Sequence, residues 1–543
     1  MKSASVNAVE ERLQESVAGS KDSYRDSGFA RMTTRGGVGR VESVRVGVRG
    51  MRFGRVASLA VCGMLALGTF AMGQSAAPAV AAKTAAKAPV QTQPWKKIAI
   101  PPLHAFKPQQ PKRIELANGL VIFLQEDHEL PFINGAILIR GGSRDEPAAK
   151  IGLVSMCMEA IRNGTSDALD DELAEKAAVI ETDGELANTS LSWSSFKQDF
   201  NSVFGATVDL LLHPPFKAGK LAYSQRNMAT AISRRNDEAG EIAERESTKL
   251  VYGAESPYAR QAEYATTSAV TLDDLKAWHE RTVVANNIIV AVSGDFDSAA
   301  MEAKLRKVFE PLQRGAAMEP VKAEFAGPKP GVYFVDKEDV DQSSVQIVGL
   351  GTERSNPDYY ALSVMNEIFS GEGFGSRLFN EVRTKLGLAY DVGGSYGAEY
   401  DHPGVFRSEA GTKSVSTVAA TQAILEEIGR LKTKPPTPEE LRKAKDDVMN
   451  SFIFQYDTPQ KMLIEQVVLA IYGYPTDYLE KYRDGIERVT AADVTRVAKK
   501  YIDVSKLAIL VVGNKTEIKP PLSTLGHVTE LDITIPPPEG AGK

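Results

Sequence analysis

The sequence predicts an α+β fold made of two similar halves in tandem, and three observations support this prediction. A helical pattern at 270–275 and an apolar strand pattern at 287–294 recur 219 residues later, at 489–494 and 506–513, without a gap. In both copies a Thr can cap the helix and a Gly ends the strand, as before a turn. Pro and Gly cluster between the copies, at 326–331. We therefore expect two copies of one unit of about 200 residues.

The composition is that of a globular protein with flanking segments. Hydrophobic residues make up 43% and charged residues 25% of the 543 residues, which excludes a wholly disordered or fibrous chain. The predicted segments, in order, are a disordered or over-called N-terminus (1–50), a signal peptide (51–73), an Ala- and Pro-rich linker (74–111), an N-terminal domain (112–325), a linker (326–331), a C-terminal domain (332–519) and a linker-like tail (520–543).

The segment 51–73 has the pattern of a secretory signal peptide. A short basic stretch begins at Met51, an uncharged apolar run covers 56–73, and small residues precede Gln74. Cleavage before Gln74 would deliver the chain to the periplasm or the exterior of a bacterium and leave no membrane span. The alternative is an uncleaved anchor, because the apolar run is near the lower limit for a membrane span.

The distribution of charge argues against nucleic acid as a partner. The chain has a formal net charge of −6, and residues 1–73 contain 11 Lys and Arg but 6 Asp and Glu, so the remainder has a net charge of −11. Such an acidic body lacks the basic face that displaces counterions from nucleic acid. Two cysteines, Cys62 and Cys157, are too few for a disulfide scaffold or a cysteine-based zinc ribbon.

A series of short motifs runs through residues 112–520. In the first half they are ANGLV at 117–121, GGSRDEP at 141–147, GL at 152–153, NGT at 163–165 and GELANTS at 184–190. In the second half they are SRLFNEVR at 376–383 and LGLAY at 386–390. In order and spacing they resemble the M16 peptidases, the family of insulinase, pitrilysin and the mitochondrial processing peptidase. The resemblance implies two homologous α/β-roll halves of the M16 metallopeptidase type that form half of a clamshell.

The resemblance also implies a zinc motif, His-x-x-Glu-His, between the GL and NGT motifs. In that motif two imidazoles bind the metal and the Glu deprotonates a metal-bound water. In this chain Ser155 and Glu159 stand at the positions of the histidines, and Met158 stands at that of the base. The helix that should supply a further ligand, at 225–232, has no carboxylate. A hydroxyl and one carboxylate are a poor set of zinc ligands, and a thioether cannot act as a base. We therefore predict that this chain holds no catalytic metal and no catalytic residue.

Replacement ligands are not evident near this motif. Cys157 lies two residues from Ser155, hence on another face of the helix, and is expected to be a small buried hydrophobe. His279, beside Trp278 on a helix, is expected to be structural. None of the six histidines is paired with another four residues away.

The second half keeps two residues that the resemblance associates with substrate. In two-chain members of the family one chain brings the zinc motif, and the other brings an Arg and a Tyr, seven residues apart, that face it. Arg383 and Tyr390 match this pair. A guanidinium presents a fixed fork of donors to a peptide carbonyl, and a tyrosine hydroxyl can donate to a developing oxyanion. The alternative is a surface ion pair for Arg383 and a half-buried strand position for Tyr390.

A glycine-rich loop precedes this pair and contains Gly371, Gly373 and Gly375. It lacks the Gly-Lys-Ser/Thr ending of a phosphate-binding loop. It is similar to the glycine-rich loop that lies beside the chamber in M16 peptidases, and we predict that these glycines contact substrate.

Three functional hypotheses follow from the resemblance. The leading one is a non-catalytic subunit that pairs with a zinc-bearing M16 sister chain and completes its substrate site, holding an extended peptide as an added strand on a sheet edge. Zinc is then expected on the partner and not on this chain. The alternatives are a scaffold or binding protein without a role in proteolysis, and a zinc peptidase with altered ligands.

Overall fold

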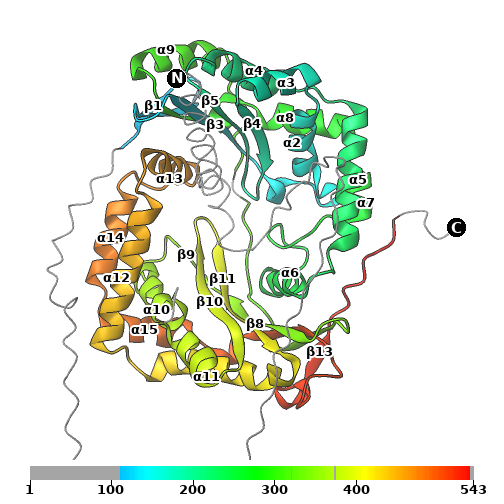
Figure 1. The fold of residues 1–543 in the computed structure, drawn as a ribbon, viewed down its shortest axis with the longest axis vertical. Coiled ribbons are helices and arrows are strands. Elements are labelled where there is room, and N and C mark those ends of the chain that lie inside the picture. The colour runs from blue at the N-terminus through cyan, green and yellow to red at the C-terminus, as the bar shows by residue number, and fades with distance from the viewer. Residues whose placement is uncertain (1–109, 320, 372–374, 539–543) are drawn as a thin grey trace, which may run out of the picture. The chain divides into compact units, whose positions relative to one another are not determined.

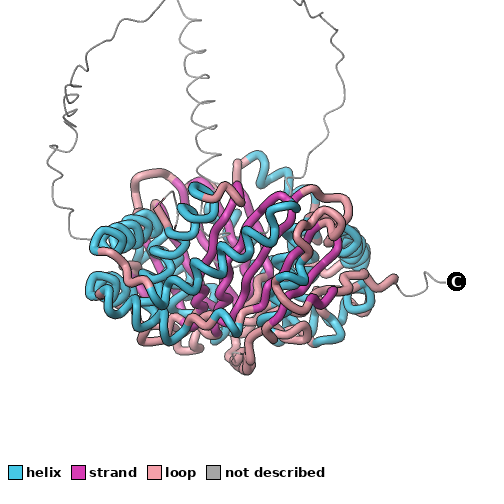
Figure 2. Tube along the Cα trace, turned by 90° about the horizontal axis from the view of Figure 1, so that it is seen from below, coloured by secondary structure: helices cyan, strands magenta, loops and turns pink. Residues whose placement is uncertain are grey.

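Two β-sheets, each covered by helices, make up the part of the chain that the computed structural model describes, residues 110–319, 321–371 and 375–538 (Figure 1). The predicted signal peptide, nearly all of the linker that follows it, and Gly373 lie outside these residues. Figure 2 shows helices lying across the strands. Within the described residues, no helix is both long and apolar enough to cross a membrane.

The first half holds a six-stranded sheet in the order β1-β2-β6-β3-β5-β4. Its strands are β1 (Lys112–Glu115), β2 (Val121–Glu126), β3 (Phe132–Arg140), β4 (Val179–Gly184), β5 (Asn188–Phe196) and β6 (Ile288–Gly294). The helices of this half are α2 (Leu153–Asn163), α3 (Asp167–Glu175), α4 (Phe200–Leu212), α5 (Ala218–Arg234), α6 (Ala239–Tyr252), α7 (Tyr264–Ser268), α8 (Leu272–Thr282) and α9 (Ser298–Phe309).

The second half holds a seven-stranded sheet in the order β13-β7-β12-β8-β11-β10-β9. Its strands are β7 (Gly331–Asp336), β8 (Gln342–Leu350), β9 (Thr352–Glu353), β10 (Ala389–Glu399), β11 (Pro403–Lys413), β12 (Ala508–Gly513) and β13 (Val528–Glu530). The helices of this half are α10 (Tyr359–Ser370), the π-helix η5 (Phe379–Lys385), α11 (Thr417–Thr433), α12 (Pro438–Gln455), α13 (Pro459–Ile471), α14 (Tyr478–Arg488) and α15 (Ala491–Tyr501).

The predicted repeat is confirmed element by element. Helix α8 and strand β6 correspond to α15 and β12, and each helix begins with a Thr–Asp capping box, at Thr271 and at Thr490. In each sheet one parallel pair, β2 with β6 or β7 with β12, is followed by an antiparallel neighbour. A capping box satisfies two backbone donors that the helix leaves unpaired. The same local sequence signal therefore starts the same unit in both halves.

The two halves exchange one helix each. Helix α13 of the second half packs Leu463 and Val467 on the first sheet, against side chains of β2, β3 and β6. Helix α6 of the first half packs Ile242 and Ala243 on the second sheet, against β7 and β12. Figure 1 shows α13 beside the first sheet and α6 beside the second. Each sheet therefore has its own helices on one face and a helix of the other half on the opposite face.

The segments between and after the halves differ from the prediction. No helix or strand is described between Phe309 and Gly331, a longer stretch than the predicted linker at 326–331. Within it, Phe325 packs on the rings of Tyr252 and Tyr258. The segment after 519 was predicted as a linker-like tail. It instead adds β13 beside β7, and Leu522 is buried in the core of the second half.

Candidate functional site

The position of the zinc motif lies on helix α2, whose start is firmly held. Gly152 caps the helix with a φ of 103°, a left-handed conformation that favours glycine. The buried carboxylate of Glu146 accepts hydrogen bonds from the backbone amides of Gly152 (3.0 Å) and Val154 (2.6 Å). Burial raises the pKa of Glu146, although these two bonds act in the opposite direction. These contacts fix the start of helix α2 independently of the side chains at 155–159.

The three side chains at the motif do not form a zinc site. Ser155 is exposed, Met158 is buried in the hydrophobic core, and Glu159 points toward helix α5. There Glu159 Oε1 accepts hydrogen bonds from the side-chain amides of Asn227 (3.0 Å) and Asn163 (3.3 Å). The group opposite Glu159 is thus an amide that donates, where a metal site needs a second anionic or imidazole ligand.

The described residues also contain no cluster of replacement ligands. No group of three or more His, Cys, Asp and Glu among them could hold a metal ion. Cys157 is buried, its Sγ faces the carbonyl of Leu275, and burial raises the pKa of its thiol to about 12. His279 is bonded to the carbonyl oxygen of Leu211 at 2.7 Å. The donor groups at 155–159 and near them, within the described residues, do not fit zinc.

Arg383 and Tyr390 lie together in the structure. The guanidinium carbon of Arg383 is 4.6 Å from the ring centroid of Tyr390 and 4.7 Å from that of Phe379. Arg383 belongs to η5, and Tyr390 is the second residue of β10, so a single turn connects them. Tyr390 is 82% exposed, and Arg383 has no ion-pair partner within the described part of the chain. Two aromatic rings therefore hold this guanidinium, and it keeps its donors for another molecule.

The glycine-rich loop lies between α10 and η5. Gly371 follows the last residue of α10, and its amide donates to the carbonyl of Glu367. A Cβ on Gly375 would meet the amino group of Lys443 on α12, which is the end of a flexible side chain and can move aside. The structure places both glycines close to helices of the second half. It does not describe Gly373.

A cavity of about 1010 Å³ lies between the two halves. The first half contributes the edge strand β4 and neighbouring residues of β5. The second half contributes the end of β10, the side chain of Tyr400 and one face of α13. Neither Arg383 nor Tyr390 lines this cavity, because the lining part of β10 begins at Ser395, about 17 Å further along the strand.

Ion pairs between the halves border the cavity. Arg144 of the first half, 7% exposed, lies 2.7 Å from Asp401 of the second half. Burial raises the pKa of Asp401, but His402 and Arg144 outweigh this effect and hold it below its usual value. Arg407 on β11 pairs with Glu244 on the exchanged helix α6. These charged groups are therefore neutralised within the chain and are not available to a ligand.

The floor of the cavity is a polar part of the first sheet that sequence reasoning missed. In β5 the large residues Leu191 and Trp193 face the core of the first half, so Ser190 and Ser192 face the opposite side, toward the cavity. The alternation of serine with large apolar residues at 190–194 could have predicted this floor. Such a pattern is typical of a strand with one buried face and one solvent-exposed face.

Comparisons with known proteins agree with this picture. Residues 269–448 match the family model described as the peptidase M16 inactive domain. The chain is 22% identical over 415 residues to the non-peptidase homolog YmxG of Helicobacter pylori, which covers 75% of this chain and 95% of that protein. It is 24% identical over 355 residues to the uncharacterized zinc protease YmxG of Bacillus subtilis, covering 64% of this chain and 85% of that protein.

Among solved structures, the fold matches that of a peptidase M16 inactive domain from Pseudomonas fluorescens. The TM-score is 0.68 at 24% identity, and the match covers 76% of this chain and 100% of that chain. The predicted α+β fold with halves of the M16 type is thereby confirmed.

Proposed function

This chain is a homologue of the M16 peptidases that carries their inactive domain, and on that premise we propose that it is a non-catalytic subunit of a two-chain peptidase. Its partner is a sister M16 chain with an intact His-x-x-Glu-His motif. Together they hydrolyse peptides, and this chain completes the substrate site. The pattern at 51–73 favours the periplasm or the exterior of the cell as the place of action.

The observation that carries this proposal is the state of Arg383 and Tyr390. The guanidinium of Arg383 is held by aromatic stacking, Tyr390 is exposed, and neither residue lines the cavity described above. A purely structural arginine would normally be paired with a carboxylate or buried along its stem. A guanidinium that stacks on an exposed tyrosine and has no ion-pair partner among the described residues is suited to bind another molecule.

The chemistry available to the pair is electrostatic. The guanidinium of Arg383 can bind the carbonyl oxygen of a peptide through two donors, which fixes the orientation of the scissile bond. The hydroxyl of Tyr390 can donate a hydrogen bond to the oxygen that becomes negatively charged. Zinc bound by the sister chain would supply the activated water. This chain contributes binding and orientation, and no proton transfer of its own is needed.

Strand β4 supports the peptide-binding part of the proposal. It ends the first sheet, so it is hydrogen-bonded to β5 on one side and borders the cavity on the other. An extended peptide can pair with such an edge through its main chain. The cavity is large enough for several residues of an extended chain.

The test is reconstitution with the sister chain. The purified chain is mixed with a sister chain that bears His-x-x-Glu-His, and hydrolysis of a quenched-fluorescent peptide library is followed. We expect each chain alone to be nearly inactive and the mixture to be active. Arg383→Ala and Tyr390→Phe should lower kcat of the mixture about 100-fold, the usual cost of removing a transition-state donor. Tyr223→Phe and Arg442→Ala, at exposed positions elsewhere, are matched controls and should have no effect.

Each other outcome contradicts the proposal in a different way. Stoichiometric zinc with activity in the isolated chain would mean that the ligand set is misread. A sister chain that is equally active without this chain would leave a scaffold or binding role. Activation that survives Arg383→Ala would show that the pair does not contact substrate.

A further inference from the structure

One face of the first sheet is divided into an apolar part and a polar part. Helix α13 covers the apolar part, where Val121 of β2, Leu138 of β3 and Ala291 of β6 pack against it. Strands β5 and β4 lie beyond this helix and form the floor of the cavity. The cavity therefore exists because α13 covers only part of this face.

The direction of the side chains on β4 follows from their contacts. Ile180 packs in the core of the first half, and the hydroxyl of Thr182 donates to the carbonyl of Met158 on α2 at 2.7 Å. Side chains alternate along a strand, so Glu181 and Asp183 point to the opposite face, above Ser192 and Ser190. Two carboxylates, about 7 Å apart along the strand, thus project from the edge of the sheet into the cavity.

The positive charges that line the cavity are already paired. Arg144 is bound to Asp401, Arg407 to Glu244, and Arg162 to Asp170. Each arginine that lines the cavity is therefore already in an ion pair. Asp170, which also lines the cavity, is the partner of Arg162.

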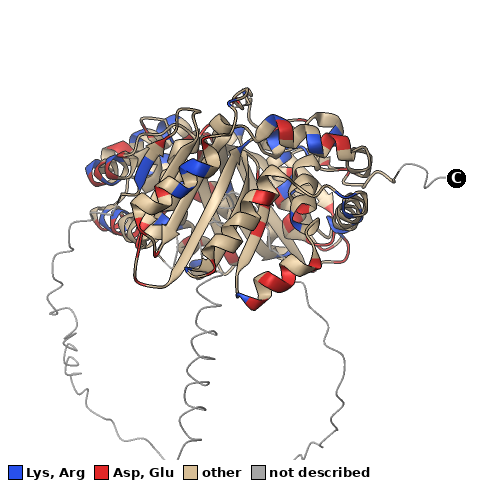
Figure 3. Cartoon of the chain, turned by 90° about the horizontal axis from the view of Figure 1, so that it is seen from above, with Lys and Arg blue, Asp and Glu red and all other residues tan. Residues whose placement is uncertain are grey.

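Three of the carboxylates that line the cavity, those of Glu181, Asp183 and Glu399, have no basic partner among the described residues. Glu181 has no hydrogen bond or ion pair to any other described residue, and Asp183 accepts only from the amide of Gly184. Glu399 faces them from the end of β10 and has no cation beside it in the described part of the chain. The adjacent helix α3 adds exposed acidic residues at the rim, and Figure 3 shows that charged residues are concentrated on the helices, whereas the strands are mostly uncharged.

The chain itself shows how a basic group binds at this edge. Arg162 donates from Nε to the carbonyl oxygen of Ile180 at 2.8 Å, and its other end pairs with Asp170. One guanidinium thus reaches a main-chain carbonyl of β4 and a carboxylate together. A peptide that carries basic side chains can repeat this arrangement further along the strand.

We infer that the cavity selects extended peptides with basic side chains at alternate positions, and this inference rests on the proposed peptide-binding role. A peptide paired with β4 has the same spacing as β4, so its side chains at i and i+2 lie beside Glu181 and Asp183 on the cavity face. Adjacent basic residues at i and i+1 would point to opposite faces, and one of them would meet the apolar side of the sheet. The rings of Tyr252 and Tyr472 also line the cavity.

The experiment is a binding measurement on the full chain without its sister chain. Four fluorescein-labelled peptides are compared by anisotropy. The first alternates Lys with Thr, the second has the same composition with the Lys residues consecutive, the third alternates Glu with Thr, and the fourth is the first with its alternate amides N-methylated. We expect the alternating Lys peptide to bind about tenfold more tightly than its consecutive isomer, and less tightly at high salt. The Glu peptide and the N-methylated peptide should bind most weakly.

A double substitution locates the effect. Glu181→Gln with Asp183→Asn should remove the preference for the alternating Lys peptide and leave binding of an uncharged Thr peptide unchanged. Glu280→Gln with Glu517→Gln removes the same charge from two exposed sites away from the cavity, and it should change nothing.

The outcomes separate this inference from the proposed function. Equal binding of the alternating and consecutive peptides, or an unchanged preference in the Glu181/Asp183 variant, would overturn the selectivity and leave the subunit role intact. Failure to bind any peptide, with activation of the sister chain retained, would overturn the inference alone. Failure of both binding and activation would overturn the proposed function as well.

Discussion

The side-chain amide of Asn227 on α5 donates a 3.0 Å hydrogen bond to Glu159 on α2. By the resemblance of the sequence to M16 peptidases, Glu159 is expected at the position of their second histidine, and Asn227 on the helix that supplies a further ligand. The two helices that a metal would join are thus joined by a neutral donor and an acceptor. Asn227 presents its NH₂ group to Glu159, and this group has no free electron pair that could bind a metal.

We therefore expect the purified chain to remain without stoichiometric zinc after incubation with the metal and dialysis. Asn227→Ala should lower the free energy of unfolding by about 1 kcal/mol, because Glu159 loses a donor. Metal analysis and urea denaturation check the two statements. Asn450→Ala, at an exposed position on α12, is the control. One bound zinc per chain would contradict the interpretation.

Cys157 should be chemically inert in the folded chain. Burial raises the pKa of its thiol to about 12, and the thiolate is the reactive form. Iodoacetamide at mildly alkaline pH should leave Cys157 unmodified in the native protein and modify it in urea. Peptide mapping by mass spectrometry distinguishes this residue from Cys62. Rapid modification of Cys157 without denaturant would show that α2 opens locally.

The ion pair between Arg144 and Asp401 should be a major contact between the halves. Arg144 is 7% exposed and Asp401 is 18% exposed, and removal of one partner leaves a charge with reduced solvation. We expect Arg144→Met or Asp401→Asn to cost about 3 kcal/mol of unfolding free energy, and the double variant to cost less than the sum. Asp446→Asn, which breaks the exposed pair with Arg442, should cost about 0.5 kcal/mol at most. Equal effects of the buried and exposed pairs would contradict this expectation.

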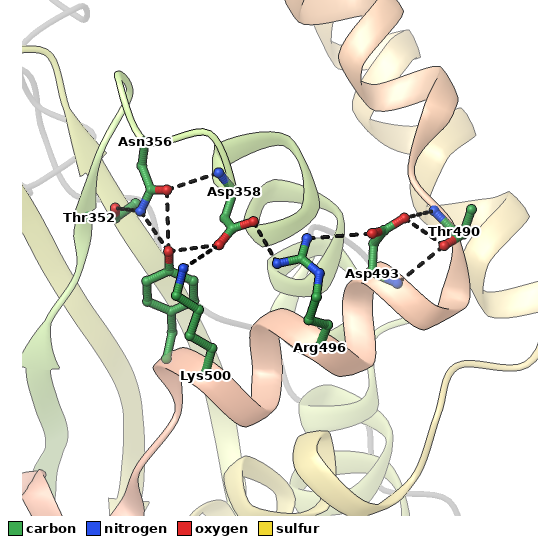
Figure 4. Close-up of polar contacts among 8 residues, drawn as sticks. Thr352, Asn356, Asp358, Thr490, Asp493, Arg496 and Lys500 are labelled. Carbon is green, nitrogen blue, oxygen red and sulfur yellow. Dashed lines mark hydrogen bonds and ion pairs between the residues drawn. The ribbon is translucent and has the colours of Figure 1, made fainter.

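Asp358 should make stability depend on pH in acid. Its carboxylate accepts from Arg496 (2.7 Å), Lys500 (2.9 Å) and the hydroxyl of Tyr501 (2.8 Å), all on α15 (Figure 4). Burial alone would raise the pKa of Asp358, but these partners lower it to about 2. Because the folded pKa lies below the unfolded value of about 3.9, the contribution is complete above that value and is lost as the pH falls toward 2.

The corresponding measurement is urea denaturation of the wild type and of Asp358→Asn at a series of pH values. The wild type should be more stable by about 1 kcal/mol near neutral pH, since Arg496 and Lys500 are half exposed and partly screened. The difference should shrink below about pH 4. A difference that is constant across this range would show that Asp358 acts through packing and not through its charge.

Local patterns predicted the parts of the fold that depend on neighbouring residues. The capped helices at Thr271 and Thr490 were predictable because a capping box lies within four residues. The contact between Arg383 and Tyr390 was predictable for the same reason, since one turn separates them.

Long-range packing was not predictable in this way. The exchange of α6 and α13 joins segments that lie far apart in the sequence, and nothing in the local sequence of either helix indicates which sheet it covers. The cavity was missed for a related reason. The carboxylates of Glu181 and Asp183 gain their significance only from the cavity that α13 leaves uncovered, and net charge could not locate them.

The exchange of helices also constrains how the protein is made. Synthesis proceeds from the N-terminus, so the first sheet is complete once residue 294 has left the ribosome. Its apolar face, with Val121, Phe123 and Leu138, then stays uncovered until Pro459–Ile471 follows. During that interval the nascent chain exposes a hydrophobic surface that promotes aggregation. The first half therefore reaches its final state only when most of the second half has been translated.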